Sequence, residues 1–167
     1  MNTGAQKISA AQDKLRPYSA LYKSGLPVLI CAALVILTVM VFWQLRDGEF
    51  LNYDDNMYVY ENAYVQSGLN WESVQQAFSS ELVEKSANWH PLTWLSHMLD
   101  VQIFGLNPAG HHLVSLFIHI ANALLLFLFL REASGSKYRS LLVATLFAVH
   151  PLHIESVAWV AAVSYTH

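Results

Sequence analysis

The chain has 167 residues, of which 54% are hydrophobic and only 13% are charged. Soluble domains usually carry about 25% charged residues, so this composition excludes an ordinary soluble domain and favours apolar runs that lie in a bilayer. The net charge of −3 excludes the strongly basic surface typical of nucleic-acid binding, and we expect no nucleic-acid partner. The single cysteine, Cys31, has no partner for an internal disulfide.

The N-terminal part predicts a cytoplasmic tail over residues 1–25 and a transmembrane helix over residues 26–45. The tail carries four basic residues against one acid, and the following twenty residues, to Leu45, contain no charge. At ~1.5 Å per residue this run covers ~30 Å, the thickness of the bilayer core. The alternative is a signal peptide, but that needs a shorter apolar region and a small-residue cleavage site, which Gln44-Leu-Arg-Asp-Gly48 does not provide.

Residues 46–110 predict a long extracytoplasmic loop, because they hold nine acids and two basic residues. The acidic pair Asp54 and Asp55 lies near its start. Within the loop, Asn70 followed by an apolar pattern predicts a short helix over 71–78, and a second helix is expected over 92–104. We expect both to be interfacial amphipathic helices on the membrane surface. The alternative is a small extracytoplasmic subdomain that packs on itself.

A second transmembrane helix is expected over residues 111–130. It contains His119 and Asn122, three residues apart, and polar groups at membrane depth usually face other helices rather than lipid. We therefore expect both side chains to serve helix packing. A short polar cytoplasmic loop is predicted over residues 131–140.

The third apolar run predicts a transmembrane helix and an outer polar cluster over residues 141–160. Counted from Tyr138 to Val149, the run has twelve residues and covers ~18 Å, which is too short to cross. The helix is therefore expected either to continue through Pro151 with a kink or to break there beside a cavity, where irregular backbone is tolerated at membrane depth.

Basic residues predict the orientation of the chain. Four lie in the N-terminal tail and three in the 131–140 loop, and such residues mark cytoplasmic segments. The acidic pair and the polar group His150, His153 and Glu155 are then expected to converge on the outer face.

These two groups suit a reaction at headgroup level. One aspartate could act as general base toward an acceptor hydroxyl, and both could help hold a divalent cation, which prefers oxygen ligands. His150, His153 and Glu155 could bind metal or stabilise a leaving phosphate, although their spacing is not that of a His-Glu-x-x-His zinc motif. The alternatives are a solvated turn at Asp54-Asp55 and ordinary polar groups at a helix end.

Several motifs in a fixed order resemble a known family. They are Asn52-Tyr-Asp-Asp55, His90-Pro-Leu-Thr-Trp-Leu-Ser-His97, Phe104-Gly-Leu-Asn-Pro-Ala-Gly-His-His-Leu-Val114 and His150-Pro-Leu-His-Ile-Glu-Ser-Val-Ala-Trp-Val160, all after an anchor helix. Over roughly residues 26–160 the chain resembles the start of bacterial multi-spanning glycosyltransferases of the GT-C type. The likeness is to the group with C-terminal tetratricopeptide repeats, related to the transmembrane O-mannosyltransferases.

The resemblance implies an all-α membrane protein of about three transmembrane helices, a truncated GT-C-like N-terminal half. It implies a multi-pass protein of the bacterial plasma (inner) membrane with a cytoplasmic N-terminus. It also implies inverting hexosyl transfer from a polyprenyl-phosphate-sugar donor to an acceptor hydroxyl, with Asp54 and Asp55 catalytic and Asp54 favoured as base. Membrane lipid is a partner, whereas the sugar, the acceptor and any divalent cation are not determined.

Other functional classes and the end of the chain give further expectations. A transporter or channel segment would use His119, His150, His153 and Glu155 as a proton or ion relay, but it has no need for the acidic pair. A membrane-anchored interaction protein is a third possibility. Residues 161–167 are expected to be a non-native tail, because Val163-Ser-Tyr-Thr-His167 matches a translated sequencing adapter. The 167-residue product is then a fragment, inactive by itself.

Overall fold

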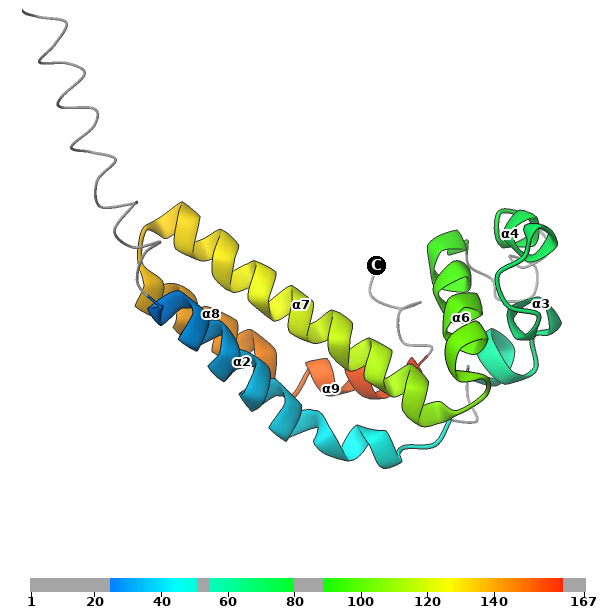
Figure 1. The fold of residues 1–167 in the computed structure, drawn as a ribbon, viewed down its shortest axis with the longest axis horizontal. Helices are drawn as coiled ribbons and strands as arrows, with labels where there is room; N and C mark the ends of the chain where they lie inside the picture. The colour runs from blue at the N-terminus through cyan, green and yellow to red at the C-terminus, as the bar shows by residue number, and fades with distance from the viewer. Residues whose placement is uncertain (1–24, 51–54, 80–88, 161–167) are drawn as a thin grey trace, which may run out of the picture.

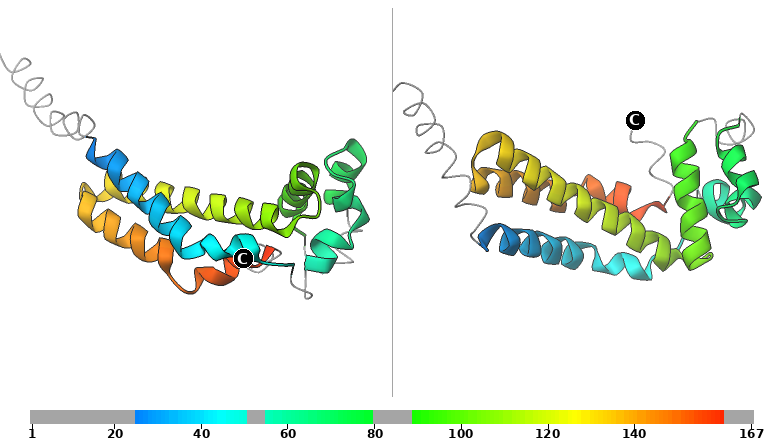
Figure 2. Two further views of the ribbon diagram at one scale, coloured as in Figure 1. Left: turned by 60° about the horizontal axis from the view of Figure 1, so that its bottom comes forward. Right: turned by 45° about the horizontal axis from the view of Figure 1, so that its top comes forward.

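The computed structural model describes residues 25–50, 55–79 and 89–160, and these ranges are helical throughout apart from turns and short links. Three helices form a long bundle: α2 (Leu26–Phe42), α7 (Pro108–Ser134) and α8 (Lys137–Val149). They lie side by side in Figures 1 and 2, and shorter helices gather at one end of them. We call α2, α7 and α8 the bundle.

Among the described residues, two helices are long and apolar enough to cross a membrane, Leu26–Asp47 and Pro108–Ser134. The first comprises α2 and its continuation as the 3-10 helix η1 (Trp43–Asp47). Both begin with a proline in the first turn, where the missing N–H leaves no helical hydrogen bond unmade. The two long apolar helices predicted from the sequence are therefore present, and α7 extends the predicted 111–130 segment at both ends.

The described part of the chain contains no third helix long enough to cross a membrane. Helix α8 has 13 residues, or ~20 Å, and it ends at His150, whose backbone is extended. Proline disfavours the helical conformation in the residue before it, so Pro151 explains this end. After a turn the chain forms the six-residue helix α9 (His153–Ala158). Of the two expected outcomes, the break at Pro151 is correct.

Two sequence-based expectations in this region are wrong. The predicted polar loop 131–140 is mostly helical, because α7 runs to Ser134 and α8 begins at Lys137. Polar residues such as Arg and Glu are good helix formers and extend both helices beyond their apolar parts. In addition, Asn122 is exposed whereas His119 is buried. Residues three apart lie about 60° apart around a helix, so α8 covers His119 and leaves Asn122 exposed.

The interior of the bundle is lined by small and polar residues as well as larger apolar ones. Ala144 and Ala148 on α8 and Ala123 on α7 are buried. The Thr38 hydroxyl is also buried and donates to the carbonyl oxygen of Leu34 at 2.7 Å. Small residues let helix backbones approach closely, which is the usual way that helices associate in lipid.

The remaining elements form what we call the end domain, residues 55–79 and 89–104. It contains η2 (Asn56–Tyr60), α3 (Ala63–Gln66), α4 (Trp71–Ala77) and α6 (Pro91–Phe104). The Asn70 side chain accepts a hydrogen bond from the Ser73 N–H and so caps α4, which confirms the helix predicted there. Val160, which follows α9, also belongs to the core of the end domain. The buried apolar residues of this core are Tyr58, Val59, Val65, Ala77, Trp94, Met98, Val101 and Val160.

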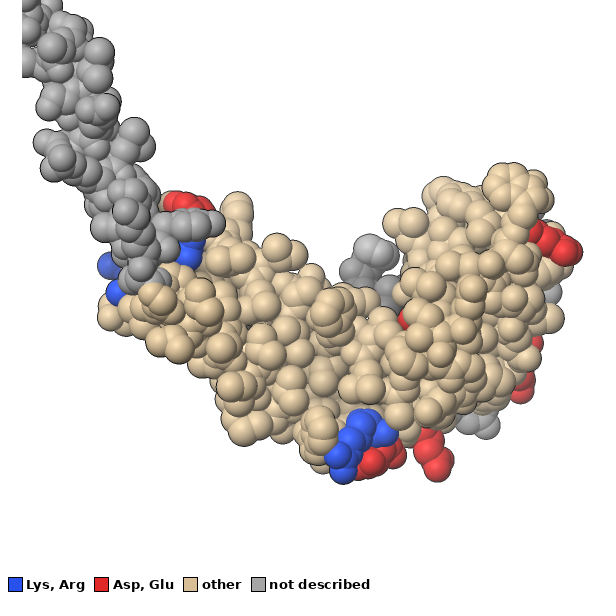
Figure 3. All heavy atoms as spheres, in the orientation of Figure 1, with Lys and Arg blue, Asp and Glu red and all other residues tan. Residues whose placement is uncertain are grey.

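The end domain packs on itself, as the alternative interpretation of the loop expects. It also leaves large apolar side chains exposed, among them Trp71, Phe78 and Leu92. Figure 3 shows most of the acidic side chains near this end and a group of basic ones at the opposite end, where α7 turns into α8. The position of this surface on a membrane stays a prediction.

Candidate functional site

Of the predicted acidic pair, Asp54 lies outside the described residues, and Asp55 is fully buried. Asp55 immediately precedes η2, whose residues Tyr58 and Val59 belong to the core of the end domain. The carboxylate of Asp55 lies near enough to His112 on α7 for their charges to interact. Asp55 therefore does not lie in a solvated turn, which was the alternative interpretation, but inside the protein, beside the start of a long apolar helix.

His112 connects this carboxylate to the end of the first apolar helix. It is buried in the first turns of α7, and a Cβ atom added at Gly48 would lie 2.9 Å from its Nε2 atom. Any other residue at position 48 would have to displace this imidazole. Sequence reasoning did not assign a role to His112, although two adjacent histidines at the start of an apolar helix were a usable signal.

The second predicted group lies at the junction of α8 and α9. The rings of His150 and His153 are 6.2 Å apart, and that of His153 lies 5.4 Å from His119 and 4.4 Å from Phe147. Glu155 is exposed on α9. An open groove of about 400 Å³ runs alongside, lined by the two histidines and five apolar residues: Leu126, Val143, Leu146, Phe147 and Leu152.

The two predicted groups lie at different heights along α7. The charge of Asp55 interacts with His112. The ring of His153 lies against His119, which is seven residues or ~10 Å further along the helix. Helix α9 runs from the end of α8 toward the end domain, and Val160 after it packs in the core of that domain. The structure therefore places both groups along the same helix and brings His150 and His153 together.

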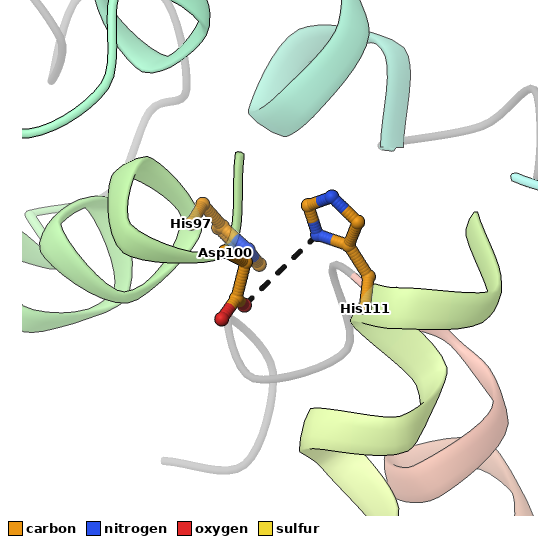
Figure 4. Close-up of side chains that lie close together, drawn as sticks. All are labelled: His97, Asp100 and His111. Carbon is orange, nitrogen blue, oxygen red and sulfur yellow. Dashed lines mark ion pairs between the residues drawn. The ribbon is translucent and has the colours of Figure 1, made fainter. Parts of the chain in front are cut away.

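A third group was missed by sequence reasoning. His97 and Asp100 lie one turn apart on α6, and His111 lies in the first turn of α7; one ligand atom from each lies within 4.8 Å of the others. Figure 4 shows the three side chains facing one another, with His111 Nδ1 3.9 Å from an oxygen of Asp100. All three are buried. The His-x-x-Asp spacing on a predicted helix was the available signal, because residues three apart share a face.

Burial disfavours the charged forms of two members of this third group, His97 and Asp100. Burial, and then the neighbouring His111, lower the pKa of His97 to about 4, so its imidazole is neutral at pH 7. Burial raises the pKa of Asp100, and His111 acts in the opposite direction. Helices α6 and α7 meet closely here: a Cβ added at Gly110 would overlap the side chain of Phe104, so this glycine permits the contact that holds His111 beside Asp100.

Curated proteins with similar sequences are protein O-mannosyl-transferases. The chain is 41% identical over 71 residues to Tmtc1 of Drosophila melanogaster, covering 42% of this chain and 8% of that protein. It is 30% identical over 150 residues to TMTC1 of Mus musculus (86% of this chain, 15% of that protein). It is 32% identical over 110 residues to TMTC2 of Homo sapiens (64% of this chain, 13% of that protein).

The chain is distantly homologous to these protein O-mannosyl-transferases. It spans only 8% to 15% of the length of the three relatives described above. No protein-family profile matches the sequence, and no solved structure matches it. The homology therefore concerns one small part of much longer enzymes.

Proposed function

We propose that this sequence is the N-terminal part of an integral-membrane glycosyltransferase. It moves a hexose, with mannose as first candidate, from a polyprenyl-phosphate donor to an acceptor hydroxyl on a protein at the outer face. The observation that carries this proposal is the similarity to protein O-mannosyl-transferases. An alignment that covers 86% of this chain includes its central part, and hence the segment with Asp54 and Asp55.

The acidic pair has a chemical role in such a transfer. Asp54 takes the proton of the acceptor hydroxyl as general base, and the acceptor oxygen then bonds to the anomeric carbon. The bond from that carbon to the phosphate oxygen breaks, and its electron pair leaves with the lipid phosphate. Asp55 is buried beside His112, so its part is to fix the start of η2 against α7.

The groove between α7, α8 and α9 suits the donor. Its apolar lining fits a polyprenyl chain, and His150 and His153 at its margin offer hydrogen bonds to a phosphate. Glu155, two residues after His153 on α9, adds a carboxylate that could help bind a divalent cation.

The proposal includes a membrane location and an orientation. The two candidate spans support a membrane location, and we propose the bacterial plasma membrane with the N-terminus in the cytoplasm. The end domain then lies outside, on the side of the membrane where we propose that transfer occurs. Tetratricopeptide repeats in the remainder of the protein belong to this proposal as well.

The test uses a protein that carries this sequence together with its remaining membrane helices. Asp54→Asn should reduce hexose transfer from a polyprenyl-phosphate donor by about 10²–10⁴-fold, the usual loss when a general base is removed. Membrane insertion should be unchanged. Asp47→Asn is the matched control, because Asp47 is a nearby exposed acid and its variant should keep full activity. Full activity in both Asp54→Asn and Asp55→Asn would contradict the assignment.

A second candidate function rests on the row of imidazoles formed by His119, His153 and His150, which a proton relay could use. One nitrogen of His119, however, is already bonded to the carbonyl oxygen of Ala148 at 3.0 Å. This bond explains the buried histidine as a link between α7 and α8. Proton uptake by liposomes that contain the protein, abolished in His153→Gln, would support the relay instead.

A further inference from the structure

The strongest unexplained feature of the molecule is the group His97, Asp100 and His111 between α6 and α7. The Nε2 atom of His111 lies 3.0 Å from the carbonyl oxygen of Gly105. A carbonyl can only accept, so Nε2 carries the proton. In neutral His111 the lone pair is then on Nδ1, and this atom faces an oxygen of Asp100 at 3.9 Å. Two acceptors in this arrangement require a proton, a water molecule or a metal ion between them.

His97 adds an independent observation. Its imidazole is buried, and neither ring nitrogen has a hydrogen-bond partner among the described residues. A buried polar group without a partner costs about 1–3 kcal/mol, and such groups usually indicate a water or an ion. A protonated His111 would form an ion pair with Asp100, but it would leave both nitrogens of His97 without a partner.

We propose that His97, Asp100 and His111 bind a divalent transition-metal ion of the Zn²⁺ class. One ion at the centre of the group accepts a lone pair from each histidine and offsets the charge of the carboxylate. Bonds of ~2.0–2.2 Å to a tetrahedral zinc ion separate neighbouring ligand atoms by roughly 3.3–3.5 Å. His111 and Asp100 are 3.9 Å apart and all three ligand atoms lie within 4.8 Å of one another, so binding requires the side chains to move inward by up to roughly 1.5 Å.

The surroundings of His111 are those of a metal ligand. A histidine that binds a metal through one nitrogen usually donates its other N–H to a carbonyl or carboxylate, which sets the tautomer and the ring orientation. The bond from His111 to Gly105 performs this role. Two imidazoles and one carboxylate suit zinc and similar ions, whereas Mg²⁺ and Ca²⁺ prefer oxygen ligands. Three protein ligands leave a fourth position for water.

The position of the site indicates its effect. Two ligands come from the last turns of α6, and the third comes from the first turn of α7. A bound ion ties the end domain to a candidate transmembrane helix across the turn that joins them. This inference does not depend on the transferase proposal, because it concerns other residues and requires no sugar donor.

The test measures metal on the 167-residue chain itself, purified in detergent micelles, stripped with a chelator and dialysed against Zn²⁺. The wild type should retain about one zinc ion per chain, and its thermal midpoint should rise with zinc, because a ligand that binds only the folded state stabilises it. Asp100→Asn and His97→Gln should each weaken zinc binding by at least about 100-fold. Loss of an outer-shell partner alone already costs 10–100-fold, and these are direct ligands.

His150→Gln is the matched control, since it removes a histidine from the other group and should leave zinc binding unchanged. Mg²⁺ and Ca²⁺ should not compete. Equal zinc content in the wild type and Asp100→Asn, or loss of zinc in His150→Gln alone, would overturn the proposal. If the ligand variants lose helicity, X-ray absorption at the zinc edge decides instead. Two imidazole ligands in the wild type and in His150→Gln support the site, and an all-oxygen shell refutes it.

Discussion

The bundle and the end domain both bury apolar residues, but their helices meet through different side chains. In the bundle, large apolar side chains such as Leu29, Phe117 and Leu125 are exposed, while alanines are buried between the helices. In the end domain, by contrast, the centre of the core is formed by large side chains: Trp94 is 1% exposed and Met98 is fully buried. Both regions have apolar residues inside and outside, and they differ in that alanines line much of the contact between the bundle helices.

This difference indicates which solvent each region meets. Burying apolar area stabilises a fold in water, and the stacked pair of Trp94 and Tyr58, with ring centroids 4.5 Å apart, does so in the end domain. Lipid is as apolar as leucine, so helices within it associate through close packing of small residues and through polar contacts. The buried alanines of α8 and the bond from His119 to Ala148 are contacts of this second kind.

The largest expected effect is an all-or-none difference in cysteine labelling between the end domain and the opposite end of the bundle. We expect these two parts to lie on opposite sides of the membrane. In a Cys31→Ala background, a cysteine in place of Glu72 on α4 should react with an impermeant thiol reagent in intact cells. A cysteine in place of Ser136, at the turn between α7 and α8, should react only after permeabilisation. The reverse pattern would show that the end domain faces the cytoplasm, contrary to the distribution of basic residues.

A large loss of stability is expected in the core of the end domain. Trp94→Ala should lower the free energy of unfolding by about 3–5 kcal/mol, because it removes a buried aromatic side chain and leaves a cavity. Trp71→Ala is the control: Trp71 is 75% exposed, and its loss should change stability by no more than about 0.5 kcal/mol. Denaturant titration followed by tryptophan fluorescence measures both. A similar loss of stability in the two variants would mean that Trp71 packs against other residues rather than lying on the surface.

A smaller loss is expected in the bundle. Ala144→Leu should cost about 1–3 kcal/mol, because added methylenes push apart helices that touch through small residues. Leu125→Ala removes a large side chain from the exposed surface of α7 and should have almost no effect in micelles. Unfolding by graded denaturing detergent, followed by circular dichroism, compares the two. A larger loss in Leu125→Ala would indicate that this surface packs against protein.

Local patterns predicted much of the fold. The charge-free run from Leu26, the Asn70 cap of α4 and the break at Pro151 each follow from a few neighbouring residues, and all three agree with the structure. Predictions that required knowledge of neighbours in space failed more often. Asn122 was expected to face another helix, but the angular position of α8 leaves it exposed, and no local pattern encodes that position.

The sequence by itself determined that this chain has long apolar helices, an acidic loop and motifs that resemble O-mannosyltransferases. Periodicity, charge and caps act within one or two turns, so they are readable without a fold. Only the tertiary structure placed Asp55 beside His112 and brought His97, Asp100 and His111 within 4.8 Å. These contacts join separate elements, and they depend on how closely α6 and η1 approach α7, which Gly110 and Gly48 permit. Such distances result from packing of the whole chain.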